Sequence, residues 1–345
     1  MEHRQQLNGD GELMADYKGI KGFTVQNLSA DPPAPIVGQV WYNSTSATLK
    51  GYTTSAGAWS SGGNVNDARD EATLTGTVTA GLLAGGKDAV YYKSTCETYN
   101  GSTWTEVGDL QTGANYAVSF GTNTAAIKCG GFVSNDPFTV TTATETWNGS
   151  SWATSPITMN TARQKMSSSN NGTTTAGLIF GGMLGPTAGL DVCESWDGSA
   201  WTEVGDLNST RGAGGGGGTQ TAAFLAGGRG APGPALRALC ETWNGTSWSE
   251  VNDLNTAREA LGSAGLTTSA LVFGGTPSPA YTEQWDGTSW TEVADLATGR
   301  EAMSRGTGAS GTSALAAAGA VPAVPAGNTE EWDGAPASTV TFTAS

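Results

Sequence analysis

The chain has 345 residues, 51 of them glycine and only 14% charged, and its formal net charge at pH 7 is −15. Such a surface repels the phosphates of nucleic acids and of anionic membranes, so we exclude both as partners. No apolar run reaches the length of a membrane span, and the first residues lack the apolar core of a signal peptide, so we expect no membrane insertion.

Residues 1–38 are polar and interrupted by glycine and proline, and residues 31–35 have the sequence of an extended linker. We predict that residues 1–38 form an anchor that becomes ordered only against another chain or protein. Two runs flanking a polar turn, residues 38–43 and 47–52, then predict a hairpin. We assign residues 39–345 to one domain, with residues 39–60 as its closing hairpin.

A unit with two aromatic-bearing runs joined by Asn-Gly or Asp-Gly recurs along this domain, and this dipeptide is the strongest short hairpin signal. The glycines of the six turns are at positions 101, 149, 198, 245, 287 and 334, so the spacings are 48, 49, 47, 42 and 47 residues. Strand-type units repeating at this spacing predict a β-propeller.

An arginine follows the second aromatic of most units at a fixed distance: Trp201 and Arg211 are ten residues apart, and Trp152 and Arg163 are eleven apart. After this connector comes a Gly/Ser/Thr-rich run, and then a small apolar strand that ends in Gly-Gly; the sixth copy, residues 315–320, is weaker. Four strands in each of six units predict an all-β, six-bladed propeller with four-stranded antiparallel blades and almost no helix. Seven blades are the alternative.

The sixth unit lacks a tryptophan at its expected fourth-strand position, Ala337, whereas Trp59 stands ten residues before Arg69. We therefore predict that residues 57–60 complete the blade of residues 305–334, and that residues 338–344 pair outside or beside that strand. In the competing arrangement residues 339–343 form the fourth strand, and Trp59 joins a hairpin with Trp41 and Tyr52.

The order of arginine, glycine, Gly-Gly strand, aromatic and tryptophan resembles the kelch repeat, although the two aromatics are closer together than in typical kelch units. The opening residues 16–23, with 38–43 and 49–52, resemble a leader found on kelch-like structural proteins of marine tailed phages. The resemblance implies a virion location after assembly in the host cytoplasm. It also implies contacts with other virion proteins through residues 1–38, and a homo-oligomer in the particle.

The four cysteines are expected to be buried free thiols of a protein that assembles in a reducing compartment. Three of them stand directly before the glutamate of a repeat, at sites too far apart for disulfides. His3 is the only histidine, which removes the commonest general base and metal ligand. We therefore predict no metal, no cofactor and no catalytic residue.

The repeated tryptophans and arginines each allow two interpretations. The tryptophan pairs could be carbohydrate-stacking platforms, but their recurrence in every unit favours core packing between blades. The arginines could ring one mouth of the channel and bind an anionic glycan, or each could pair with an acidic residue of its blade; we favour the pairing. These arginines are Arg69, Arg163, Arg211, Arg258 and Arg300.

The segments between each Gly-Gly and the next glutamate vary in length and content on a fixed frame, which is typical of recognition loops. Plain tolerance of surface insertions explains the variation equally well. These loops are residues 87–96, 132–144, 183–193, 229–240 and 276–282. Their aromatic residues are the candidate binding residues Tyr91, Tyr92, Phe132, Phe138 and Tyr281.

We therefore expect a non-enzymatic phage virion protein, a tail-fibre or appendage propeller for receptor binding and adhesion to a host-surface glycan or protein, or for decoration of the particle. One alternative is a carbohydrate-active propeller enzyme, although no pair of carboxylates stands out from the repeats. Another is a host-cell protein-interaction scaffold. The ligand, the oligomeric state and the place in the particle are left open by the sequence.

Overall fold

The computed structural model describes residues 6–7, 13–14, 25–33, 35, 38–53, 57–185, 188–230, 235–302, 310–321, 324–334 and 338–342. Its regular elements are all β-strands, as predicted, and the described residues contain no helix that could span a membrane. The chain divides into two compact units: residues 57–334 form one, and residues 1–56 with 335–345 form the other.

Five four-stranded antiparallel sheets follow one another along residues 57–334, an arrangement consistent with a β-propeller. The first consists of β7 (Thr73–Thr77), β8 (Ala80–Ala84), β9 (Cys96–Tyr99) and β10 (Trp104–Val107). The second consists of β11 (Val118–Gly121), β12 (Ala126–Cys129), β15 (Thr144–Trp147) and β16 (Trp152–Thr154). The third consists of β17 (Ser167–Ser168), β18 (Gly177–Phe180), β19 (Cys193–Trp196) and β20 (Trp201–Val204). The fourth consists of β22 (Gly215–Thr219), β23 (Ala222–Ala226), β26 (Cys240–Trp243) and β27 (Trp248–Val251). The fifth consists of β28 (Gly262–Leu266), β29 (Ser269–Phe273), β30 (Thr282–Trp285) and β31 (Trp290–Glu292).

The sixth sheet confirms the predicted pairing of an N-terminal strand with the end of the repeat. It consists of β32 (Ser313–Ala317), β35 (Thr329–Asp333) and β6 (Ala58–Ser61). Trp332 on β35 is directly opposite Trp59 on β6. The strand β32 corresponds to the second strand of the other sheets, so the innermost strand predicted for this unit falls on residues 303–309, outside the described residues.

The predicted hairpins join the third and fourth strands. The two aromatic residues of each copy are directly opposite each other, as Trp243 and Trp248 are in the fourth sheet. Asn244 Oδ1 accepts hydrogen bonds from the backbone N–H groups of the turn, and Gly245 has φ = 94°, a conformation that glycine adopts without strain. Outer tryptophans therefore occupy equivalent strands, as the repeat predicts. In the first five sheets these are Trp104, Trp152, Trp201, Trp248 and Trp290.

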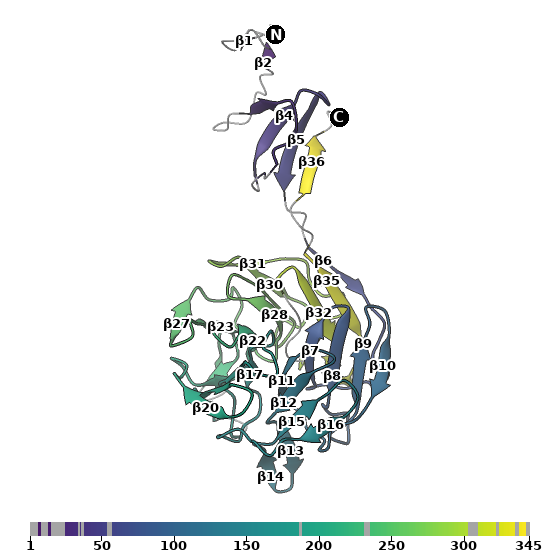
Figure 1. Cartoon of the computed structure of the whole chain (residues 1–345), viewed down its shortest axis with the longest axis vertical. Helices are drawn as coiled ribbons and strands as arrows, with labels where there is room; N and C mark the ends of the chain where they lie inside the picture. Colours follow the sequence, from purple (N-terminus) through teal and green to yellow (C-terminus); the bar gives the residue numbers. More distant parts are fainter. Residues whose placement is uncertain are drawn as a thin grey trace. The chain divides into compact units, whose positions relative to one another are not determined.

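The sheets stand side by side with their first strands innermost. In Figure 1 the labels of β7, β11, β17, β22 and β28 lie near the middle of this unit, and those of β10, β16, β20, β27 and β31 lie near its rim. Each of the five inner strands contacts the next, and both β7 and β28 contact β32. The first and last units of the repeat are therefore neighbours in space.

Six apolar clusters fill the interfaces between consecutive sheets, which confirms the interpretation of the tryptophan pairs as core. Trp196 and Trp201 of the third sheet pack with Phe120 and Ile127 of the second. The same arrangement brings Tyr99 and Trp104 of the first sheet against strand β32 of the sixth. Burial of these large aromatic surfaces between sheets contributes a major part of the folding free energy.

The Gly-Gly pairs at the ends of the second strands connect neighbouring units. The second glycine donates its backbone N–H to the carbonyl of the residue at the arginine position of the next unit, as Gly131 does to Arg163 at 3.0 Å. Gly319 in the sixth unit donates in the same way to Arg69 in the first, at 2.9 Å. A side chain at the second position would collide with backbone; a Cβ on Gly131 would lie 2.8 Å from the Asn115 carbonyl oxygen.

The smaller unit differs from the sequence-based domain boundary. Its sheet is ordered β3 (Gln26–Leu28), β4 (Val40–Asn43), β5 (Thr48–Thr53) and β36 (Ser338–Phe342), and β1 (Gln6–Leu7) pairs separately with β2 (Leu13–Met14). The hairpin placed in the propeller therefore pairs with β36, and both predictions for residues 338–344 are wrong. The edge of β35 is already occupied by β6, and β36 pairs with β5 instead. Most of residues 1–38, the predicted anchor, lie outside the described residues.

Candidate binding face

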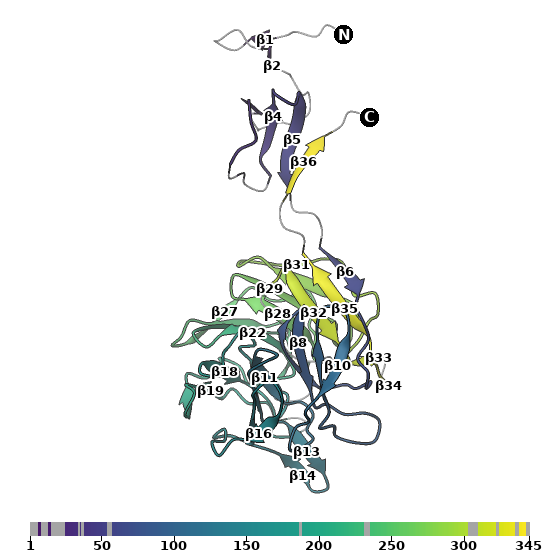
Figure 2. The ribbon, with the colours of Figure 1, turned by 45° about the vertical axis from the view of Figure 1, so that its right-hand side comes forward.

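One face of residues 57–334 carries both the arginine connectors and the loops that follow Gly-Gly. In each unit the residue after the arginine position pairs with the first residue of its loop, as Asp70 pairs with Lys87 and Asn115 with Phe132. Several loops contain a further ribbon. These ribbons are β13 (Phe132–Asn135) with β14 (Phe138–Val140), β24 (Arg229–Gly230) with β21 (Arg211–Gly212) and β25 (Ala235–Leu236), and β33 (Ala320–Val321) with β34 (Val324–Pro325). Figures 1 and 2 both show β13 and β14 projecting beyond the sheets.

A ring of left-handed backbone residues lies at the centre of this face. Six non-glycine residues, one in each unit, have φ between 50° and 62°: Glu71, Tyr116, Lys165, Ala213, Ala260 and Ala302. Each such residue costs on the order of 1 kcal/mol, so the surrounding structure must hold it. Hydrogen bonds between units do so: Tyr116 N–H donates to the Glu71 carbonyl at 2.8 Å, and Glu71 N–H donates to the Ala302 carbonyl at 2.8 Å.

The five predicted arginines are fully buried and each pairs with the glutamate of its own sheet, as the favoured interpretation predicts. Arg211 Nη2 donates to Glu241 Oε1 at 2.7 Å, and Arg258 Nη2 donates to Glu283 Oε1 at 2.8 Å. The pairs are Arg69–Glu97, Arg163–Glu194, Arg211–Glu241, Arg258–Glu283 and Arg300–Glu330. These guanidiniums have no surface with which to contact a glycan, so we assign them to the blades and not to a binding site.

The second sheet departs from this pattern. Ala114 stands where the other units have arginine, and Glu145 instead has Lys128 Nζ at 4.0 Å. Lys128 is opposite Glu145 on the neighbouring strand and is fully buried, and this burial lowers its pKa from the usual range. A lysine from a strand thus replaces the missing arginine of the connector.

A small pocket of about 290 Å³ lies where the six units meet, and all six contribute to its lining. Its charged side chains are mostly matched: Lys87 Nζ lies 2.9 Å from Glu71 Oε1, and Arg229 Nε lies 3.3 Å from Glu259 Oε2. The Lys165 ammonium lies over the Tyr116 ring at 4.2 Å from its centre. The centre of the face is therefore polar and internally paired.

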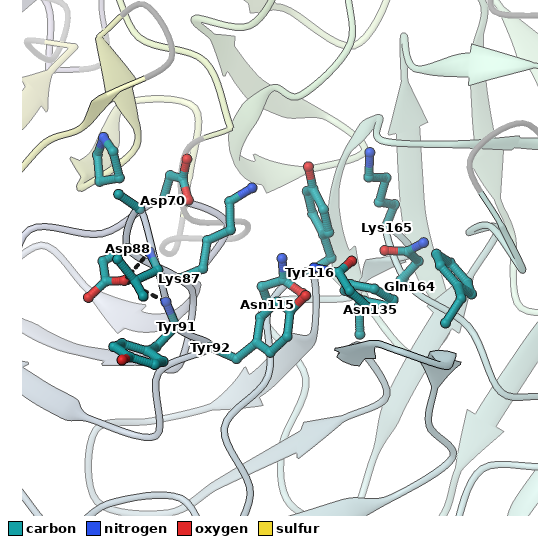
Figure 3. A pocket seen from close by; sticks show the side chains of 15 residues that line it. Asp70, Lys87, Asp88, Tyr91, Tyr92, Asn115, Tyr116, Asn135, Gln164 and Lys165 are labelled. Atoms are coloured by element: carbon teal, nitrogen blue, oxygen red, sulfur yellow. Dashed lines mark hydrogen bonds between the residues drawn. The ribbon is translucent and has the colours of Figure 1, made fainter.

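A larger pocket of about 610 Å³ lies beside it, lined chiefly by the first three units. Figure 3 shows side chains from several loops and connectors around this pocket. Its polar lining residues include Asp70, Lys87, Asp88, Asn115, Asn135, Gln164 and Lys165. Its aromatic lining residues are Tyr91, Tyr92, Tyr116, Phe132 and Phe138.

Four of the five aromatic residues chosen from the sequence line this pocket. Tyr91 and Phe138 are 72% and 47% exposed, whereas Phe132 is only 6% exposed. The Phe132 ring instead supports its neighbours, with centroids 5.4 Å from Tyr92 and 4.7 Å from Phe138. The fifth, Tyr281, is 39% exposed on the loop of the fifth unit and is not part of the pocket.

Asp70 lines both pockets, and its carboxyl has a shifted pKa. Burial, followed by repulsion from the Glu71 carboxylate, raises the pKa of Asp70 to about 7. Asn115 Nδ2 donates a short hydrogen bond to Glu71 Oε2, which fixes that neighbouring carboxylate. By contrast, a hydrogen bond from the Lys93 side chain and two hydrogen bonds from backbone N–H groups lower the pKa of Asp88 to about 2.

The four cysteines are free and buried, and burial raises the pKa of each thiol to about 12. They are therefore poor nucleophiles. Within the described ranges, no group of three or more His, Cys, Asp and Glu side chains is arranged to hold a metal ion.

Sequence reasoning missed the polar half of the pocket. Asp70, Asn115 and Gln164 follow the arginine position directly, where the repeat gives Gly212, Glu259 and Glu301 in the other units. Variation at this one position of an otherwise regular connector is the signal that could have identified it. Comparisons with protein-family models and with curated proteins found no match to this chain.

Proposed function

We propose that residues 57–334 form a closed six-bladed kelch-like β-propeller. The proposal is supported by three contacts that join the sixth unit to the first in the way that other neighbours are joined. They are the hydrogen bonds from Gly319 to Arg69 and from Glu71 to Ala302, and the packing of Trp104 against the sixth sheet. A cryo-EM map of the full chain tests it, because seven blades or an open edge between β7 and β32 would contradict it.

We further propose that the protein is a non-enzymatic structural protein of a tailed phage, in a tail fibre or another appendage, and that its loop face attaches the particle to the host surface. The observation that carries the binding role is the presence of large exposed apolar side chains on the loops of one face, since exposed apolar surface on a folded protein often marks an interaction site. These side chains are Val90, Tyr91, Phe138, Leu184, Tyr281 and Val324. The virion role is supported by the resemblance of residues 16–23, 38–43 and 49–52 to a phage leader.

The binding role is tested by attachment of purified full chain to host cells. A variant with Val90, Leu184 and Val324 changed to Glu places charges on three loops, and we expect it to lose attachment. The matched control is Thr246→Glu with Thr288→Glu, since both residues are exposed on hairpins at the opposite ends of the strands. Equal attachment by the two variants would rule out the loop face, and antibody labelling of particles tests the virion location.

A carbohydrate-active enzyme is the second candidate, and Asp70 is the observation that favours it. A carboxyl with a pKa near 7 at the border of a pocket has the property required of a general acid. Hydrolysis of nitrophenyl glycosides by the full chain, abolished by Asp70→Asn, would favour the enzyme over the binding protein.

A further inference from the structure

We infer that the 610 Å³ pocket beside the centre of the loop face binds an uncharged sugar ring of a host-surface glycan. The inference deepens the proposed attachment function and rests on it. It assigns the ligand class from the chemistry of the side chains that line the pocket.

The size and shape of the pocket favour a small ring over a flat protein surface. Pockets of roughly 300–1,000 Å³ are typical of small-molecule sites, whereas a stable protein interface needs about 800 Å² on each partner. Two loops contribute its aromatic lining: residues 87–92 carry Tyr91 and Tyr92, and the ribbon β13–β14 carries Phe132 and Phe138.

The aromatic wall can stack against the apolar face of a sugar ring. Phe132 is held between Tyr92 and Phe138, so the three rings form a continuous row in which the buried member fixes the outer two. Tyr91 and Phe138, which both line the pocket, keep large exposed surfaces. Aromatic rings of this kind, which offer area at a low cost in conformational entropy, suit a rigid ligand with C–H groups on one face.

The polar lining can bind the hydroxyl groups at the edge of the same ring. Asn135 and Gln164 line the pocket, and each amide supplies donors together with an acceptor, which is the combination that a sugar hydroxyl needs. Backbone geometry fixes one of them, because Gln164 is paired with Met183 in the ladder between connector and loop.

The charges around the pocket favour a neutral ligand. Lys87 is paired with Glu71, and Asp88 is paired with Lys93, so these four groups satisfy one another. The lining holds two lysines and two aspartates, and the whole chain carries a formal charge of −15, which repels polyanions. Acidic polysaccharides are therefore disfavoured, and neutral hexose units remain.

The experiment is saturation-transfer NMR on the full chain with glucose, galactose, mannose and N-acetylglucosamine, and with glucuronic acid as the charged counterpart. We expect at least one neutral sugar to receive saturation and glucuronic acid to receive little. Phe138→Ala and Tyr91→Ala should each weaken binding roughly two- to tenfold, because each removes one stacking surface. Phe138→Trp should restore it.

Tyr281→Ala is the matched control, since Tyr281 is an exposed loop aromatic of the same face that does not line the pocket. Thermal unfolding of each variant checks the fold, and we expect Phe138→Ala, at an exposed ribbon, to leave it intact. Failure of every neutral sugar to bind, or equal binding by Phe138→Ala and wild type, would overturn the inference.

Cell attachment by the same variants separates this inference from the proposed function. If loop-face charges abolish attachment while no neutral sugar binds, the attachment function stands, the sugar site is wrong, and a host protein is the partner. If a neutral sugar binds and Phe138→Ala weakens that binding, while the loop-face charges leave cell attachment unchanged, the sugar site stands and the attachment role is wrong.

Discussion

Trp59 donates its indole Nε1–H to Thr282 Oγ1 at 3.0 Å, although 223 residues separate them in the chain. Trp104 makes the equivalent bond to Thr329 Oγ1, also at 3.0 Å. In both, the outer tryptophan of one sheet reaches the first residue of the third strand in the preceding sheet. An N-terminal residue therefore acts as the outer tryptophan of the last unit.

This relationship predicts how truncation acts. Removal of residues 1–56 leaves β6 in place, whereas removal of residues 1–61 deletes it and exposes the edge of β35. Both truncations remove β5, the partner of β36, so the comparison isolates β6. We expect the longer truncation to aggregate more than the shorter one, since an unpaired strand edge templates further pairing, and to lose about 3 kcal/mol more with the Trp59 contacts. Light scattering and thermal unfolding measure both effects; identical behaviour of the two chains would contradict the role given to β6.

Lys128 replaces an arginine in the second sheet, so we expect an arginine at position 114 to compensate for its loss. Lys128→Leu should destabilise the protein by about 3–5 kcal/mol, because it leaves the buried Glu145 without a cation. Adding Ala114→Arg should recover most of this loss, since it restores the arrangement of the other five units. Chemical denaturation measures both variants.

Lys93→Leu is the control for this rescue, since Lys93 pairs with exposed or half-buried aspartates and should cost no more than about 1 kcal/mol. A double variant as unstable as Lys128→Leu would show that Ala114 is not equivalent to the arginine positions.

Asp70 predicts a dependence of stability on pH. Its pKa is raised from 3.8 to about 7 in the folded protein, so the folded state binds more protons than the unfolded state between these values. The contribution of the Asp70 carboxyl to the free energy of unfolding is therefore fully present below pH 4 and is lost as the pH rises through 7. Asp70→Asn should be the more stable protein at pH 8, by on the order of 1–3 kcal/mol, and should show no gain near pH 4. Thermal unfolding across this range checks it, and a gap independent of pH would refute the assignment.

The position of Cys96 predicts how two substitutions there change the stability of the protein. Cys96 occupies the place of Thr282 and Thr329, and its thiol lies beside the Trp152 indole, whose buried N–H makes no conventional hydrogen bond. Cys96→Thr supplies a stronger acceptor and should stabilise by about 1 kcal/mol, whereas Cys96→Val, which has the same shape, should not. Urea denaturation of the pair measures the difference. Equal stabilities would mean that the hydroxyl does not reach Trp152.

The repeat predicted much of the fold because its signals are local. Asn-Gly and Asp-Gly turns impose hairpins, and the outer strand at Trp59 was recognisable from its distance to Arg69. The pairing of β36 was not predictable, because a short strand of alternating threonine is compatible with several edges. The aromatic half of the pocket was recognised from variable loops, while Asp70 and Gln164 were not, because they stand within a regular connector.

By itself, the sequence determined the order of the four strands in a unit, the hairpins, the tryptophans of the core and an acidic partner for each arginine, since all of these follow from residues at fixed spacing in the repeat. The tertiary structure alone decided which loop and connector residues from different units meet. It placed Tyr91 and Phe138 in the lining of one pocket, and it gave Asp70 a neighbouring carboxylate and a burial that raise its pKa. Such properties depend on distances between loops and on burial, and neither is encoded in the spacing of a repeat.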